Sequence, residues 1–179
     1  MKLSPEVVAR IRGVKLAVFD VDGVMTDGSL VYSDQGEAIK VFNTLDGHGM
    51  KMLQRSGVEL AIISGRGCQA LEMRAQNLGV KHLLQHVENK AEAYEKLLQT
   101  LGLARSLAAS IGDDVVDLPI LLHCGFSAAV PAAPAFVRER VDYVTQAHGG
   151  HGAVREFCEV IMAAQGTLDA ALGQYTATI

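Results

Sequence analysis

The chain contains an Asp-Val-Asp-Gly sequence in which two carboxylates lie two residues apart. Asp20 lies near the end of an apolar, β-rich segment, residues 15–21. Asp22 follows this segment directly, and Gly23 allows a sharp turn there. Two such carboxylates repel each other and are unfavourable to bury, unless a divalent cation binds between them. Two aspartates that merely cap a loop are the alternative. The pattern predicts a cation site at the carboxyl end of a buried strand, where open α/β sheets bind ligands.

A second acidic cluster follows another apolar segment, residues 107–111. It contains Asp113, Asp114 and Asp117. A few protein oxygen ligands favour Mg²⁺, which keeps several of its waters. The alternative is an acidic first turn that suits a helix dipole, and this explains Asp117 better than Asp113, which precedes the helix. We therefore predict Mg²⁺ as the cofactor.

Two further segments could bind a phosphate group. Ser64 and Arg66 follow the apolar segment 58–63, where a hydroxyl and backbone N–H groups can bind phosphoryl oxygens. Lys90 begins a predicted helix, which is the unfavourable end of the helix dipole for a cation and so indicates an anionic partner. A solvated surface lysine is the alternative for Lys90.

Together these residue types suit hydrolysis of a phosphate ester through a covalent intermediate. Mg²⁺ and Lys90 would neutralise the phosphate and the carboxylates, so that an anionic nucleophile can approach. Asp20 would attack phosphorus and form an aspartyl-phosphate. Asp22 would protonate the leaving alkoxide and then activate the hydrolytic water. With Ser64 on a phosphoryl oxygen, the predicted catalytic residues are Asp20, Asp22, Ser64 and Lys90.

The elements that must position these residues alternate along the chain. Strands are predicted at 15–21, 58–63, 81–84, 107–111, 126–130 and 142–144. Helices are predicted at 5–13, 46–56, 68–78, 89–101, from about 116, and at 153–164. This alternation predicts an α/β fold with a mostly parallel sheet and helices on both faces. Two alternating segments around the turn 33–36 predict a β-hairpin, and residues 168–179 are expected to be frayed.

Composition indicates one globular domain over residues 1–179. The 16 Lys+Arg against 20 Asp+Glu, a net charge of −4, argue against a nucleic-acid partner. Three scattered cysteines (Cys68, Cys124 and Cys158) form neither a disulfide framework nor a zinc cluster and favour a reducing compartment. No signal-peptide segment or membrane span is recognisable. We predict a cytoplasmic protein with no membrane partner.

Four motifs, in this order, resemble the haloacid dehalogenase superfamily of phosphatases. They are DVDG (20–23), ISGR (63–66), Lys90 and GDDVVD (112–117). The resemblance implies a Rossmann-like three-layer α/β/α fold, with Asp20 as the nucleophile and Asp22 as the acid/base. It also implies that Mg²⁺ is bound by the Asp20 side chain, the Asp22 backbone carbonyl and Asp113. Asp114 would act through water or a hydrogen bond, and Asp117 would support the loop.

Longer segments resemble one branch of this superfamily, which removes phosphate from an eight-carbon keto-sugar acid in lipopolysaccharide synthesis. They are DVDGVMTDG, FNTLDGHGM, IISGR, ENK, GDDVVDLPIL and GGHGAVREFCEVIMAAQG, and the resemblance spans roughly residues 15–166. It implies a β-hairpin at about 29–42 in place of a cap domain. It also implies a homotetramer in which the hairpin and the Gly-rich tail and helix, about 148–165, of neighbouring subunits close each active site. A plain edge hairpin is the alternative.

The same resemblance implies a set of substrate contacts. The loop 43–47, with Lys51, would line the sugar side, and Arg66 and Arg74 would bind phosphate or carboxylate. Taken alone, Arg74 would be a solvated helix residue. Lys51 and His151 depart from the family pattern, since arginine is usual at both positions, and histidine is only partly charged near neutral pH. The predicted substrate-binding residues are Asp22, Asn43, Thr44, Leu45, Asp46, Gly47, Lys51, Arg66, Arg74, Lys90 and His151.

The predicted function is therefore that of a Mg²⁺-dependent phosphatase for a small sugar-acid phosphate. A phosphatase for a related nonulosonate 9-phosphate is the alternative. It would share every motif, and only the ratio of kcat/KM for the two sugar phosphates would distinguish it. A mutase or phosphonatase usually carries an inserted cap, for which the segment 22–46 is too short. A non-catalytic tetrameric scaffold is a further alternative, although the four catalytic positions are intact.

Overall fold

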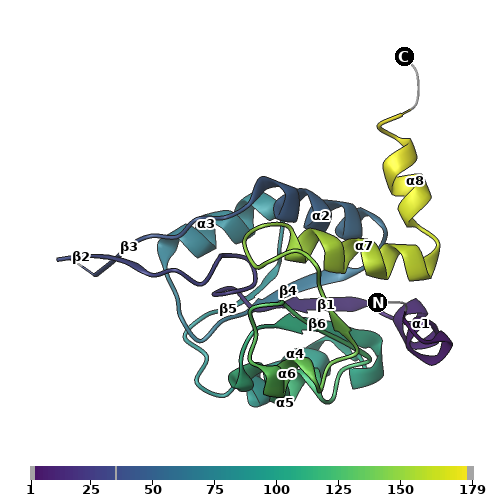
Figure 1. The fold of residues 1–179 in the computed structure, drawn as a ribbon, viewed down its shortest axis with the longest axis horizontal. Helices are drawn as coiled ribbons and strands as arrows, with labels where there is room; N and C mark the ends of the chain where they lie inside the picture. The colour runs from purple at the N-terminus through teal and green to yellow at the C-terminus, as the bar shows by residue number, and fades with distance from the viewer. Residues whose placement is uncertain (1–2, 35, 177–179) are drawn as a thin grey trace.

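The computed structural model describes residues 3–34 and 36–176, in which strands and helices alternate as predicted (Figure 1). The strands are β1 (Leu16–Phe19), β2 (Val31–Ser33), β3 (Gly36–Ile39), β4 (Glu59–Ile63), β5 (His82–Leu84), β6 (Ala108–Gly112), β7 (Phe126–Ala129) and β8 (Tyr143–Val144). The α-helices are α1 (Pro5–Arg12), α2 (Thr44–Arg55), α3 (Gln69–Leu78), α4 (Lys90–Leu101), α5 (Leu118–Leu121), α6 (Ala135–Arg138), α7 (Ala153–Gln165) and α8 (Leu168–Gly173). Two short 3₁₀ turns are η1 (Arg105–Leu107) and η2 (Val115–Asp117).

A six-stranded sheet, in the order β5-β4-β1-β6-β7-β8, forms the middle layer, and all its pairs are parallel. Helices α2, α3 and α7 cover one face, and α4, α5 and α6 lie on the other (Figure 1). The predicted three-layer α/β/α fold is confirmed. In the register of β1, Phe19 pairs with Ile62 of β4 and Ile111 of β6. The segments that follow these three strands therefore meet at one edge of the sheet.

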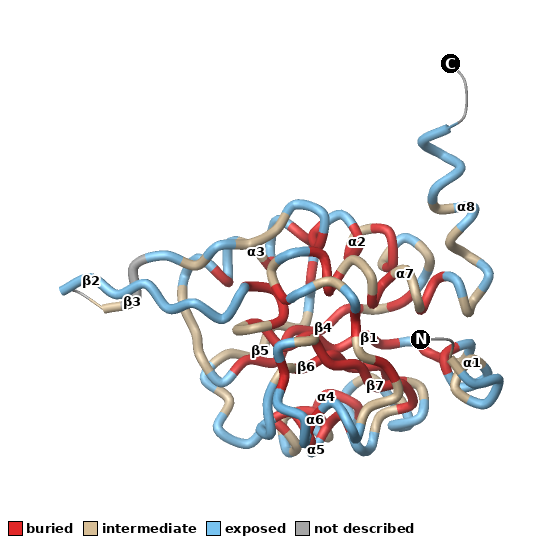
Figure 2. Tube along the Cα trace, in the orientation of Figure 1, coloured by how far each residue is buried: buried red, intermediate tan, exposed pale blue. Residues whose placement is uncertain are grey.

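The central strand β1 is buried on both faces, as its uninterrupted apolar sequence predicts. Ala17 and Phe19 pack into the core under α7, whereas Leu16 and Val18 belong to the core on the α4 side. The Phe19 ring meets Phe157 of α7 edge-on, with centroids 5.7 Å apart. Figure 2 shows the buried residues concentrated along the sheet and the inner sides of the helices. Packing on both faces holds the carboxyl end of β1 in place, and the first acidic motif, residues 20–23, follows directly after it.

The hairpin is present in place of a cap domain. Strands β2 and β3 pair antiparallel as a separate two-stranded sheet that extends away from the body, opposite α8 (Figure 1). Val31, Tyr32 and Ile39 are exposed on it, as is Val41 just beyond β3. Residue 35, within the predicted turn, lies outside the described residues. A two-stranded ribbon is marginally stable in water by itself, so this hairpin needs contacts beyond its own strands.

Three local features differ from the sequence-based predictions. Residues 168–173 form helix α8 rather than a frayed end, while 177–179 of that segment lie outside the described residues. The helix expected from about 116 begins as the 3₁₀ turn η2 and continues as the four-residue α5. Helix α6, which follows Pro134, was not expected. Among the described residues, no helix has the length and hydrophobicity needed to cross a bilayer.

Candidate active site

Asp20 lies at the carboxyl end of the central strand. Its backbone N–H donates to the carbonyl of Ile111 at 3.1 Å, which continues the pairing of β1 with β6 by one residue. Its side chain is buried, and Oδ1 accepts a hydrogen bond of 2.6 Å from the ammonium of Lys90. The strand therefore carries the predicted nucleophile directly into a buried, charged site.

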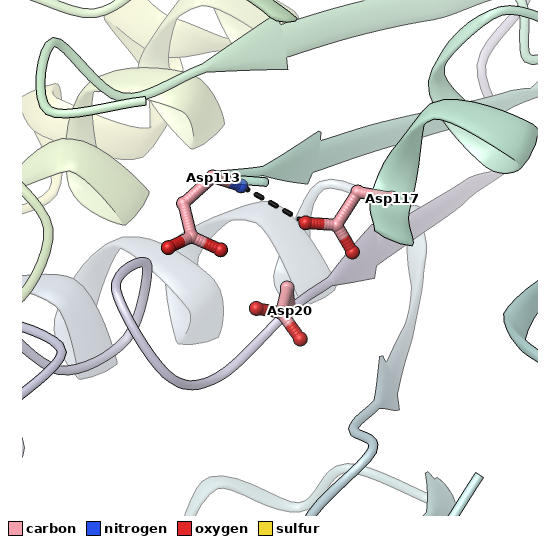
Figure 3. Close-up of side chains that lie close together, drawn as sticks. All are labelled: Asp20, Asp113 and Asp117. Atoms are coloured by element: carbon pink, nitrogen blue, oxygen red, sulfur yellow. Dashed lines mark hydrogen bonds between the residues drawn. The ribbon is translucent and has the colours of Figure 1, made fainter. Parts of the chain in front are cut away.

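Three carboxylates converge at this edge of the sheet (Figure 3). Asp20, Asp113 and Asp117 each offer one oxygen, and these oxygens lie within 4.8 Å of one another. Burial comes first in raising the pKa of Asp113 to about 8, and the neighbouring Asp20 and Asp117 raise it further. Burial, followed by the charge of Asp117, raises the pKa of Asp20 to about 6, against the opposing effect of Lys90.

Burial and the mutual repulsion of the carboxylates both disfavour their charged forms, and a bound cation would oppose both effects. Closely spaced, partly buried carboxylate oxygens are the donors that Mg²⁺ prefers. The pair Asp20 and Asp113 therefore fits the predicted ion. Bound there, Mg²⁺ would supply positive charge to the carboxylates and to the phosphoryl oxygens.

Lys90 is the first residue of α4, and Asn89 caps that helix by accepting from the N–H of Glu92. The Lys90 ammonium donates to Asp20 Oδ1 and to Asp117 Oδ1, both at 2.6 Å. Burial opposes the charge of Lys90, but Asp20 and Asp117 outweigh it and raise its pKa. The anionic partner that its place in the sequence indicated is therefore present, and Lys90 is no solvated surface residue.

In the loop after β6, Asp117 and Asp114 make different contacts. Asp117 Oδ2 accepts from the N–H groups of Asp113 at 3.0 Å and Asp114 at 3.2 Å, which is the loop support expected of it. The Asp114 side chain instead accepts from the N–H of Val115 at 2.7 Å and is exposed. Asp117 thus joins Asp20 and Asp113 in the acidic cluster, whereas the expected contribution of Asp114 through water stays a prediction.

Asp22 has a partner that was not predicted from the sequence. The ammonium of Lys40, just beyond β3, donates to Asp22 Oδ1. The side chain of Lys40 is 4% exposed and that of Asp22 21% exposed. The base of the hairpin is therefore bound to the predicted acid/base residue. No pattern in the sequence signals this pairing, because it depends on the path of the hairpin.

Glycines allow the catalytic loop to pack tightly. Gly23 has a φ of +91°, and a Cβ there would collide with the Asp113 carboxylate. A Cβ on Gly149 would overlap the carbonyl of Gly23, and the N–H of Gly150 donates to the carbonyl of Val24 at 3.0 Å. The Gly-rich segment thus packs on the catalytic loop of its own chain.

Ser64 and Arg66 lie where β4 ends. Ser64 is 1% exposed, and its hydroxyl accepts from the N–H of Arg66 at 3.2 Å. The guanidinium of Arg66 donates to the hydroxyl of Tyr32 on the hairpin at 2.6 Å. The segment 64–66 therefore follows the strand that pairs with β1, and it contacts the hairpin through Arg66.

The residues around the start of α2 hold other parts of the site together. Asn43 caps α2 by accepting from the N–H of Leu45, and its amide donates to the carbonyl of Gly150. Arg74 donates to the Asn43 carbonyl at 2.9 Å, so it is engaged by the protein rather than solvated. Its Nε is buried and has no hydrogen-bond partner within residues 3–34 and 36–176.

Asp46 is buried, and its carboxylate accepts from the N–H groups of Gly152 at 3.3 Å and Arg155 at 2.9 Å at the start of α7. Burial raises its pKa, against these hydrogen bonds and the charge of Arg74. Gly47 leaves space that the Arg74 guanidinium occupies. Asp46 and Gly47 thus position neighbouring groups, whereas Thr44 and Leu45 are exposed and Lys51 is half-buried.

A cavity of about 440 Å³ lies beside the acidic cluster. Its lining is formed by Gly23, Asp27, Gly28, Asp113, Ala132, His148, Gly149 and His151. His151 therefore lines the same cavity as Asp113 of its own chain, whereas the resemblance implied a contribution from a neighbouring subunit. Asp27, Ala132 and His148 were not predicted from the sequence. Of these, only His148 could have been predicted, because it lies in the Gly-rich segment three residues before His151.

Comparison with known proteins agrees with this geometry. Residues 82–157 match the family model of the haloacid dehalogenase-like hydrolases. The chain is 42% identical to 3-deoxy-D-manno-octulosonate 8-phosphate phosphatase KdsC of Escherichia coli K12 over 172 residues, which cover 96% of this chain and 92% of KdsC.

Two solved structures are similar over nearly the whole chain. A probable YrbI family phosphatase from Pseudomonas syringae is 49% identical, with a TM-score of 0.95 and coverage of 98% of this chain and 100% of that one. The 3-deoxy-D-manno-octulosonate 8-phosphate phosphatase from Moraxella catarrhalis, solved with magnesium, phosphate and KDO, is 39% identical, with a TM-score of 0.92 and coverage of 95% and 98%. This chain is accordingly a Mg²⁺-dependent phosphoric monoester hydrolase, and it belongs to the haloacid dehalogenase-like hydrolases, in the family of the 3-deoxy-D-manno-octulosonate 8-phosphate phosphatases.

Proposed function

We propose that this enzyme hydrolyses 3-deoxy-D-manno-octulosonate 8-phosphate to the free sugar acid and phosphate, in lipopolysaccharide synthesis. The substrate named for the Escherichia coli relative supports this, as do the phosphate and KDO in the Moraxella catarrhalis structure, since these are the two products of that reaction. One observation carries the chemical part of the proposal. The Lys90 ammonium lies 2.6 Å from Asp20 at a strand end that also gathers Asp113.

In the first half of the reaction, Asp20 attacks phosphorus and the bond from phosphorus to the sugar oxygen breaks. Asp22 gives its proton to the departing alkoxide, and the aspartyl-phosphate of Asp20 remains. In the second half, Asp22 takes a proton from a water molecule that attacks the same phosphorus. Phosphate leaves and the Asp20 carboxylate returns. Lys90 and Ser64 bind the phosphoryl group throughout, so that charge is neutralised before attack.

Substrate contacts follow from the side chains around this centre. We assign the phosphoryl side to Lys90 and Arg66, and the sugar side to the loop 43–47 with Lys51. Asp46 and Gly47 would act there through the groups that they position. The buried Nε of Arg74, still without a partner within the described chain, supports a role for that guanidinium in binding an anionic group. The cavity at His151 supports a place for the sugar acid next to Asp113.

A homotetramer is also proposed. The exposed apolar side chains of the hairpin, Val31, Tyr32, Ile39 and Val41, support it, because burying them against other subunits would stabilise a marginal ribbon. We further propose a cytoplasmic location, in keeping with the reducing compartment that the scattered cysteines favour. Sedimentation at several concentrations tests the assembly, and cell fractionation tests the location.

The decisive experiment measures phosphate release from a panel of sugar-acid phosphates. We expect the highest kcat/KM for 3-deoxy-D-manno-octulosonate 8-phosphate, and loss of activity when EDTA removes Mg²⁺. A higher kcat/KM for a nonulosonate 9-phosphate would replace the substrate but keep the chemistry. Absence of hydrolysis for every phosphomonoester in saturating Mg²⁺ would contradict the function itself.

A further inference from the structure

The hairpin reaches the acidic site through one buried lysine. Lys40 follows β3, and its ammonium donates to Asp22 Oδ1. With a side chain only 4% exposed, it lies among the least accessible cations of the described chain. Burying an ammonium is unfavourable unless charged or polar groups bind it, and the Asp22 carboxylate is one such group.

The contact has consequences for the geometry of Asp22. Asp22 sits on a loop, whereas Asp20 is fixed by β1 and Lys90. A carboxyl group that transfers a proton must be held within hydrogen-bond reach of the leaving oxygen, and a loop side chain needs a partner to hold it. Since Lys40 binds Oδ1, Oδ2 is the oxygen that would carry the transferred proton.

We propose that Lys40 is a positioning residue for Asp22, so that the base of the hairpin belongs to the acid–base machinery of the phosphatase. This inference rests on the proposed role of Asp22. Lys40 keeps its own proton. In the first half-reaction Asp22 Oδ2 passes a proton to the alkoxide as the phosphorus–oxygen bond breaks, and in the second half-reaction Asp22 takes a proton from the attacking water.

Two substrates separate this role from a merely structural one. An alkyl phosphate, the sugar-acid phosphate itself, needs a proton on its leaving oxygen. p-Nitrophenyl phosphate releases a stable phenolate and does not. In K40M we expect kcat for the alkyl phosphate to fall about 10²-fold, the size of a general acid–base contribution. With p-nitrophenyl phosphate we expect a rapid burst of one phenolate per active site, followed by slow turnover, because formation of the aspartyl-phosphate is retained and its hydrolysis is slowed.

Three variants complete the test. K96M removes an exposed lysine of α4 and should match the parent protein on both substrates. K40R retains the charge and should recover part of the alkyl phosphate activity. D22N should reproduce the pattern of K40M. If K40M shows no melting transition and is therefore unfolded, the same kinetic measurements are made on K40Q.

The outcomes distinguish the two claims. Ordinary turnover of the alkyl phosphate by D22N would overturn the proposed role of Asp22. The expected pattern in D22N but parent-like kinetics in K40M would overturn the role of Lys40 alone. Loss of the phenolate burst in a folded K40M would also overturn it, because Lys40 would then serve the first attack or substrate binding rather than proton transfer.

Discussion

Lys90 and Asp20 are 70 residues apart in the sequence, and the ammonium of one lies 2.6 Å from the carboxylate of the other. The side chains are only 7% and 9% exposed. The pair brings the start of α4 to the end of β1, and Asp117 binds the same ammonium from the loop after β6. Three segments of the sheet edge are thus held by one cation.

Removing that cation should destabilise the protein as well as inactivate it. We expect K90M to lower the free energy of unfolding by about 3 kcal/mol without Mg²⁺, because two buried carboxylates would lose their partner. Urea denaturation in EDTA measures this. K96M, which changes an exposed lysine, is the matched control. A loss no larger than that of K96M would show that Lys90 does not hold the site together.

Substituting the nucleophile should separate activity from stability. We expect D20N to lower kcat by several orders of magnitude while the melting temperature stays at or above that of the parent, since one of three crowded carboxylates becomes neutral. Phosphate release and a thermal melt measure the two effects. D169N, at an exposed aspartate of α8, is the control. Retained kcat in D20N would refute covalent attack by Asp20.

The raised pKa values predict how Mg²⁺ binding varies with pH. Asp20 and Asp113 have pKa values of about 6 and about 8, above the ordinary aspartate value of 3.8. The metal-free native state therefore binds protons more tightly than the unfolded chain, and the stability it gains in this way is lost as pH rises through those values.

Mg²⁺ must displace these protons. We expect its effect on the melting temperature to be larger near about pH 8 than near about pH 5. Melts with EDTA and with excess MgCl₂ at both pH values give the two differences, and D113N should reduce the change between them. Equal stabilisation at both pH values would contradict the assignment of the ion to these carboxylates.

Substitution of Gly23 can distinguish the stability cost of a strained backbone from the effect of a steric collision with Asp113. G23A and G57A both place a Cβ on a backbone with positive φ, +91° and +99°, and each should lose about 1 kcal/mol of stability from that source. Only at Gly23 would the new atom collide with Asp113. We therefore expect G23A alone to weaken Mg²⁺ binding, measured by calorimetry. Unchanged affinity in G23A would show that Asp113 has room to move without losing the ion.

His151 provides a test of the sugar-acid site. We expect H151A to raise KM about tenfold with little change in kcat, as for loss of one hydrogen bond to a charged group. H151R should keep or lower KM, because a permanent cation replaces the imidazole. A substrate analogue without the carboxylate is the control and should respond less to either change. An unaltered KM in H151A would remove His151 from the site.

The sequence predicted the sheet and the place of the first acids because both depend on local pattern. Unbroken apolar segments such as 15–21 mark buried parallel strands, and polar residues directly after them must lie at one edge. Asp20 and Asp113 could therefore be placed in the same site from the sequence alone. Lys90 was placed there by its position at a helix start, which is unfavourable for a cation without an anionic partner.

Features that depend on rotation about short elements or on the path of a loop were not predictable. The 3₁₀ turn η2 directs Asp117 inward and leaves Asp114 exposed, a difference that their spacing does not reveal. The pairing of Lys40 with Asp22 depends on where the hairpin returns to the body. Helix α8 has no fully buried residue, so the apolar periodicity that marks longer helices is weak there.

The close packing of Gly149 on Gly23 bears on the order in which the enzyme is made. The ribosome adds Asp20 long before it adds Gly149, whose backbone encloses the loop of that nucleophile. A nascent chain that ends between Lys90 and Gly149 contains every catalytic side chain and yet lacks one wall of the cavity. Activity should therefore begin late in synthesis, after the last strand has joined the sheet.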